Sequence, residues 1–95
     1  MESIEILLLR AYSQLEKEEA ISVFHQLNLV DSEIGCKSIT LYKDISIIGD
    51  ISIIICWQHD ICENKSRLGS QLAQAFSEFG QVNHSCLIKE YQIDV

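Results

Sequence analysis

Two short segments of this chain are apolar at nearly every position rather than at alternate ones. They are Ile6-Leu7-Leu8-Leu9 and Ile51-Ser52-Ile53-Ile54-Ile55-Cys56. Neighbouring side chains of a strand point to opposite faces of the sheet, so such runs indicate strands that are buried on both faces. A chain this short has too few helices to cover both faces. We therefore expect a second copy of the protein to cover the face that the helices leave open.

The rest of the pattern predicts two helices and two further strands around these segments. Ser13 and Glu16 fit a capping box, in which each side chain satisfies a free amide at the start of a helix. Gly80 is placed to end the second helix in the left-handed conformation. The predicted elements, in order, are strand 4–12, helix 14–29, strand 37–46, strand 51–58, helix 66–79 and strand 82–93.

This order, β-α-β-β-α-β, predicts a ferredoxin-like α+β domain that spans residues 1–95. Its four-stranded antiparallel sheet would have the strand order 4-1-3-2, with both helices on one face. The two apolar runs then occupy the central strands. Burying each large aliphatic side chain on the open face would stabilise a dimer by roughly 1.5–3 kcal/mol. We therefore predict a homodimer that forms sheet to sheet.

Composition narrows the class of partner. The chain has 95 residues and a formal net charge of −7, with 47% hydrophobic and 22% charged residues. An acidic chain is unsuited to bind nucleic acid or an anionic membrane surface through its charge. The N-terminal apolar run is too short for a signal peptide, and acidic residues flank it. We expect a cytoplasmic protein with no nucleic-acid and no membrane partner.

The four cysteines are expected to be reduced thiols, because the sequence shows no secretory signal. Cys56, His59 and Cys62 are spaced three residues apart, and His84 with Cys86 could approach them. That spacing does not match a zinc knuckle. We therefore expect no metal site and no cofactor.

The strand that ends in Cys56-Trp57, the helix that follows it and the strand that begins Val82-Asn83-His84 resemble the dimeric α/β-barrel superfamily. That superfamily includes the antibiotic-biosynthesis monooxygenases. The resemblance implies two ferredoxin-like subunits packed sheet to sheet, each with a pocket between its sheet and helices. Some members oxidise aromatic substrates without metal or flavin. The haem-degrading branch of the superfamily resembles this chain in the tryptophan but also uses a histidine on the second helix. This chain has no histidine between Lys65 and Gly80, so the resemblance does not favour haem degradation.

We predict that the first and third strands run parallel and the fourth opposite to them. Polar residues of three strands then meet at one end of the sheet: Arg10, Tyr12, Trp57, Gln58, His59, Asn83 and His84. Apolar cavities with a few polar groups are typical small-molecule sites. This reasoning makes His84 and Tyr12 the candidate catalytic residues. The candidate ligand-binding residues are Arg10, Trp57, His59 and Asn83.

Each candidate has a catalytic or binding role and a structural alternative. His84 is a candidate general base, or a histidine satisfied by a neighbour. Trp57 forms a wall for a flat ligand or belongs to the core. Arg10 clamps an anion or pairs with an acidic residue. Tyr12 orients a substrate oxygen or packs at the strand end.

Three functions remain open at this level. The first is a homodimer that binds a small organic ligand between sheet and helices. The second is a cofactor-independent monooxygenase that acts on an aromatic or quinol-like substrate. The third is a regulatory module like the ACT domains, with its ligand at a subunit interface. An RNA-binding role is disfavoured, because aliphatic residues occupy the central strands where aromatic and basic residues would be needed.

Overall fold

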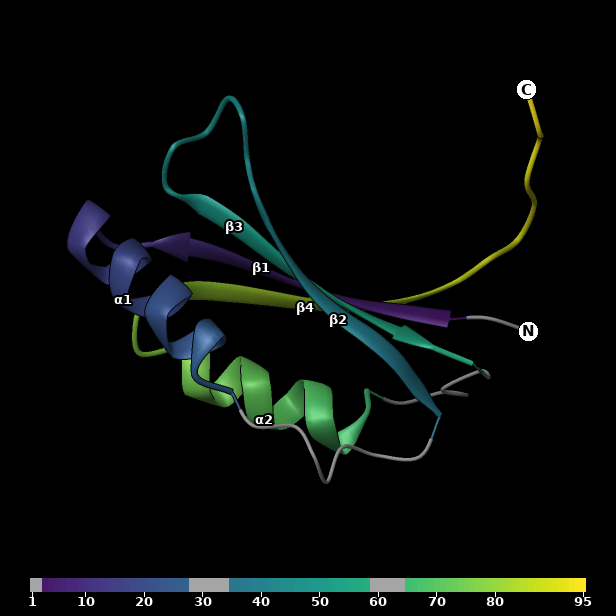
Figure 1. Cartoon of the computed structure of the whole chain (residues 1–95), viewed down its shortest axis with the longest axis horizontal. Helices are drawn as coiled ribbons and strands as arrows, with labels where there is room; N and C mark the ends of the chain where they lie inside the picture. Colours follow the sequence, from purple (N-terminus) through teal and green to yellow (C-terminus); the bar gives the residue numbers. More distant parts are fainter. Residues whose placement is uncertain (1–2, 28–34, 59–64) are drawn as a thin grey trace.

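A four-stranded antiparallel sheet covered on one face by two helices forms the fold, as seen in a computed structural model (Figure 1). The structure describes residues 3–27, 35–58 and 65–95. The strand order is β2-β3-β1-β4, which confirms the predicted ferredoxin-like arrangement. The elements are β1 (Ser3–Ala11), α1 (Gln14–His25), β2 (Cys36–Lys43), β3 (Asp50–Trp57), α2 (Arg67–Phe76) and β4 (Gly80–Ile88).

The central strands run antiparallel, as the predicted sheet requires, and only the parallel alignment that was used to place the site residues differs. β1 pairs antiparallel with both β3 and β4, so the prediction that the first and third strands run parallel is wrong. The reason lies in the connections. Helix α1 carries the chain back so that β1 and β2 run the same way, and the hairpin after β2 then reverses β3. Ser3 therefore pairs with Trp57, and Arg10 at the other end of β1 pairs with Asp50.

Serine side chains cap both helices, and the sequence predicted the cap at Ser13. The hydroxyl of Ser13 accepts from the backbone N–H of Glu16, and that of Ser66 accepts from the N–H of Gly69 at 2.8 Å. The predicted role of Gly80 is wrong, because α2 ends at Phe76 and Gly80 opens β4. A Cβ at Gly80 would overlap the backbone of Arg10, so close approach to β1 is what requires glycine there.

Side chains on alternate positions of the two central strands divide the molecule into two faces. On the helix face, Leu7 and Leu9 of β1 lie against the α2 side chains Leu72 and Phe76 in one buried core. On the opposite face, which we call the open face, the central strands present half-buried side chains. The aliphatic ones are Ile4, Ile6, Leu8 and Ile54.

Two segments with exposed apolar side chains extend from the sheet at its opposite ends. The hairpin tip between β2 and β3 exposes Ile45 and Ile48 fully or largely, and the C-terminal segment 89–95 exposes Tyr91 and Ile93. In Figure 1 both segments rise on the side of the sheet away from the helices. The hairpin tip is tied to α1, because the Nζ of Lys17 donates to the carbonyl of Ile48.

Backbone hydrogen bonds order the start of the same hairpin tip. The carboxylate of Asp44 accepts from the backbone N–H of Ile47 at 2.7 Å and from that of Ser46 at 2.8 Å. Both bonds lower the pKa of Asp44 below its ordinary value, and the bond from Ile47 has the larger effect. The tip therefore holds its exposed isoleucines on an ordered turn.

Candidate functional site

A carboxylate lies in the buried layer between sheet and helices. Glu5, on β1, is on the same face as Leu7 and Leu9, and none of its surface is exposed. Burying a carboxylate is costly unless hydrogen bonds or charges compensate for the lost water. Glu5 therefore needs polar partners, and three lie within hydrogen-bond distance.

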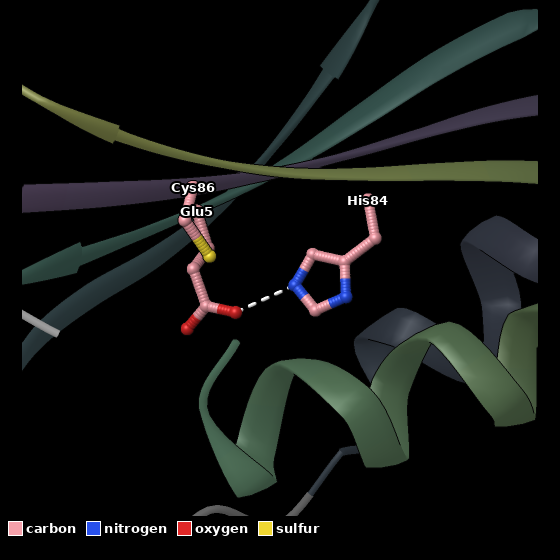
Figure 2. Close-up of side chains that lie close together, drawn as sticks. All are labelled: Glu5, His84 and Cys86. Carbon is pink, nitrogen blue, oxygen red and sulfur yellow. Dashed lines mark hydrogen bonds and ion pairs between the residues drawn. The ribbon is translucent and has the colours of Figure 1, made fainter. Parts of the chain in front are cut away.

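The first partner is His84, whose Nε2 lies 2.6 Å from the Oε2 of Glu5. His84 is on β4, where it pairs with Leu7, and its side chain is 7% exposed. Figure 2 shows the two side chains pointing from neighbouring strands toward the start of α2, joined by this bond. A carboxylate can only accept, so Nε2 carries the proton of a neutral His84. Its Nδ1 then has a free lone pair, and no described residue donates a hydrogen bond to it.

The other two partners come from β3 and from the N-terminus of α2. The indole N–H of Trp57 donates to the Oε1 of Glu5 at 2.9 Å. The backbone N–H of Ser66, the cap of α2, donates to its Oε2 at 3.3 Å. The positive end of the helix dipole also favours a negative charge at this place. Each oxygen of Glu5 therefore accepts a hydrogen bond from a residue other than His84: Oε1 from Trp57 and Oε2 from Ser66.

Gly69 allows α2 to approach this carboxylate. A Cβ at position 69 would overlap the Oε2 of Glu5 and would lie 2.8 Å from the Nε2 of His84. The side chain of Glu5, a strand residue, occupies the space that glycine leaves open beside the helix. The helix loses stability through glycine and gains this contact.

Glu5, His84 and Cys86 are the described residues whose ligand atoms lie close enough together to hold a metal ion. The donor set fits poorly. Burial, and after it the negative charge of Glu5, raises the pKa of the Cys86 thiol, which keeps it protonated near neutral pH. Both oxygens of Glu5 already accept from N–H donors. We therefore treat the cluster as a hydrogen-bonded site.

Two of the predicted site residues lie at the far end of the sheet. Arg10 and Trp57 are separated by seven positions along the β1–β3 pairing, roughly 23 Å at the usual rise of a strand. Arg10 donates two hydrogen bonds to the carboxylate of Asp50. It is therefore paired with an acidic residue of its own chain, the alternative to clamping an anionic ligand. Tyr12 follows β1 at that same end and is 67% exposed. The expected meeting of Arg10 and Tyr12 with Trp57 is therefore wrong.

The other candidates divide between the two faces. Asn83 is exposed and pairs with Leu8, so it lies on the open face, opposite to its neighbour His84. His59 lies outside the described residues. Trp57 and His84 both contact the carboxylate of Glu5, which was not among the predicted site residues. Glu5 could have been found in the sequence as the one acidic residue within the apolar strand, in phase with Leu7 and Leu9.

No protein-family model matches the chain, and no curated protein is similar to it in sequence. Solved structures are similar in fold. The monooxygenase ActVA-Orf6 of Streptomyces coelicolor, solved with nanaomycin D, has a TM-score of 0.69 at 9% identity, over 98% of this chain and 91% of that one. SnoaB, a cofactor-independent oxygenase from Streptomyces nogalater, has a TM-score of 0.63 at 11% identity, over 97% and 96%. The chain shares the fold of these oxygenases.

The predicted resemblance in fold to the monooxygenase-like ferredoxin proteins is thereby confirmed. A conserved protein from Methanosarcina mazei has the same fold, with a TM-score of 0.70 at 11% identity, over 95% of this chain and 94% of that one. Identities this low show the fold alone. Within the described residues, neither helix is long and apolar enough to cross a membrane.

Proposed function

We propose that the protein binds a small, neutral aromatic compound with an acidic C–H or O–H group, such as an anthrone or a quinol, and that His84 removes that proton as the first step of an oxygenation without cofactor. The observation that carries this proposal is the buried bond between Glu5 and His84. That bond gives His84 the tautomer with a free lone pair on Nδ1. The Glu5 carboxylate also stabilises the positive charge that the imidazole gains when it takes up the proton.

The neutrality of the ligand follows from the charges around the site. Glu5 brings a buried negative charge to the site, and the chain as a whole is acidic. An anionic ligand would be repelled there, whereas a neutral acid becomes an anion only after its proton has moved to His84. Quinols and anthrones are acids of this kind.

The oxygen chemistry balances with molecular oxygen as the oxidant. Proton loss from the methylene of an anthrone leaves an electron-rich carbanion, which reduces oxygen and binds it. The methylene then loses its second hydrogen, one oxygen atom stays as the new carbonyl, and the other leaves as water. The two oxygenases of the same fold, ActVA-Orf6 and SnoaB, support an enzyme of this class.

Proton removal can be tested apart from oxygenation. Anthrone is incubated with the protein in D2O without oxygen, and exchange at its methylene carbon is followed by mass spectrometry or NMR. We expect exchange faster than in buffer, loss of the effect in His84→Ala, and its retention in His25→Ala, which changes an exposed histidine on α1. Oxygen uptake should follow the same order. Equal exchange in both variants would exclude His84 as the base.

The functional unit in this proposal is a homodimer formed through the open face. Its central strands carry Ile4, Ile6, Leu8 and Ile54, and the hairpin tip and C-terminal segment add exposed apolar side chains on the same side. An apolar surface of this extent is typical of an interface. Ile4 and Leu87, a cross-strand pair, also line an open apolar pocket of about 260 Å³ with Ile88 and Lys89. A second copy is the occupant that this surface fits.

A charge at the centre of the open face should give a monomer. Ile6 and Ile54 pair across β1 and β3, so Ile6→Glu would place an unpaired carboxylate in the middle of the interface. We expect sedimentation equilibrium to give twice the chain mass for the wild type and for Leu15→Lys, a change at an exposed position of α1. Ile6→Glu should give the single mass. A wild type that is monomeric at micromolar concentration would contradict the dimer.

The ACT-like alternative stays a prediction. It places a ligand at the subunit boundary, whereas the Glu5–His84 pair lies on the other face of the sheet. A ligand found between the open faces of two copies would favour that alternative.

A further inference from the structure

We propose that Trp57 is a positioning residue that acts through Glu5, and that it does not stack against the ligand. Together with the first turn of α2, it holds the Glu5 carboxylate in the orientation that keeps the proton of His84 on Nε2. This inference rests on the proposed role of His84 as a base, and it assigns to Trp57 a task separate from ligand binding.

The polar edge of the tryptophan is already occupied. Its indole N–H, the only donor of the side chain, lies 2.9 Å from the Oε1 of Glu5, and the residue is 2% exposed. The ring belongs to the same buried core as Ile55 and Leu68. A stacking wall for a ligand would have to offer an open ring face, and Trp57 instead lies within the core while its N–H is bonded to Glu5.

The three contacts of Glu5 come from three different elements. Trp57 on β3 holds Oε1, while Ser66 at the start of α2 and His84 on β4 both contact Oε2. Gly69 limits the space on the helix side, since even one added carbon would overlap Oε2. Rotation of the carboxylate would break the bonds to Trp57 and to His84 together. The N–H of Trp57 therefore fixes the plane of the carboxylate, so that one oxygen stays directed at His84.

The consequence for His84 is a fixed ring and a fixed tautomer. If the carboxylate were free to turn away, the imidazole could place its proton on either nitrogen, and the lone pair needed for proton abstraction would be on Nδ1 only part of the time. Supporting residues of this kind typically change affinity or activity by about 10–100-fold. A positioning role predicts a loss in kcat, because the ligand itself does not touch the indole.

The sharpest test replaces the indole N–H by sulfur without changing the shape of the ring. Incorporating 3-benzothienylalanine at position 57 removes the donor to Glu5. We expect kcat for oxygen uptake with anthrone to fall about tenfold, with KM changed less than about twofold. In ¹⁵N NMR spectra, His84 should change from one tautomer, protonated at Nε2, to a mixture of two.

Three results would overturn the proposal: an increase in KM at constant kcat, which would place the ligand against Trp57; unchanged kinetics; or an unchanged tautomer. If the wild type takes up no oxygen, the proposed function fails, and the NMR comparison still decides the positioning role. Trp57→Phe is the second variant. Phe76→Leu, a core change at the other end of α2, controls for lost packing and should leave the tautomer of His84 unchanged.

Discussion

Glu5→Gln is expected to lower kcat for proton abstraction about as much as His84→Ala does, by roughly 10²–10⁴-fold. Glutamine keeps the size of the side chain and can still accept from Trp57 through its oxygen. Its NH2 group would then face the Nε2 of His84. A donor at this place forces the proton of the imidazole to Nδ1, so the base loses its lone pair on the side of the ligand. Initial rates of anthrone oxidation measure the effect.

A tautomer change makes this prediction specific. In Glu5→Gln the ¹⁵N spectrum of His84 should show protonation at Nδ1 instead of Nε2. The variant should also lose about 1–3 kcal/mol of stability, because the N–H of Ser66 would face the new NH2 group. Glu19→Gln, an exposed change on α1, is the matched control and should behave like the wild type. An active Glu5→Gln protein with His84 still protonated at Nε2 would refute the mechanism.

The fold was predictable because each of its elements has a local signal. Alternate apolar positions and continuous apolar runs predicted the four strands, and Ser13 marked the start of the first helix. The relative direction of β1 and β3 is a property of the connections. It follows from the split arrangement, in which each helix joins two strands that run the same way with a third between them. Treating the central strands as parallel moved Arg10 and Tyr12 to the wrong end.

The candidate site was predictable in part. His84 and Trp57 stand out in the sequence as residue types that carry chemistry, and the structure brings both to one carboxylate. Glu5 was missed because an acidic residue near the start of a chain resembles a solvated end. Only its phase with Leu7 and Leu9 shows that it faces the helices. The contact between Gly69 and Glu5 depends on how α2 crosses β1, which no local pattern specifies.

Gly69→Ala is expected to destabilise the protein by about 2–5 kcal/mol, although alanine favours a helix by about 1 kcal/mol over glycine. The new Cβ would push the Glu5 carboxylate away from its present position. Each hydrogen bond of that buried charge contributes about 1.5–3 kcal/mol, so losing two of the three outweighs the gain in helix propensity. Urea unfolding followed by the fluorescence of Trp57 measures the change.

A double-mutant cycle shows whether this loss acts through Glu5. Ser70→Ala, an exposed change in the same turn of α2, is the control for helix propensity and should leave stability unchanged or slightly higher. In a Glu5→Ala background the Cβ added at position 69 finds the space that the carboxylate has left, so Gly69→Ala should cost about 1–3 kcal/mol less there than in the wild type. An equal cost in both backgrounds would mean that glycine serves the backbone of α2 alone. A smaller cost would show that the helix is built to pass directly over the carboxylate that orients His84.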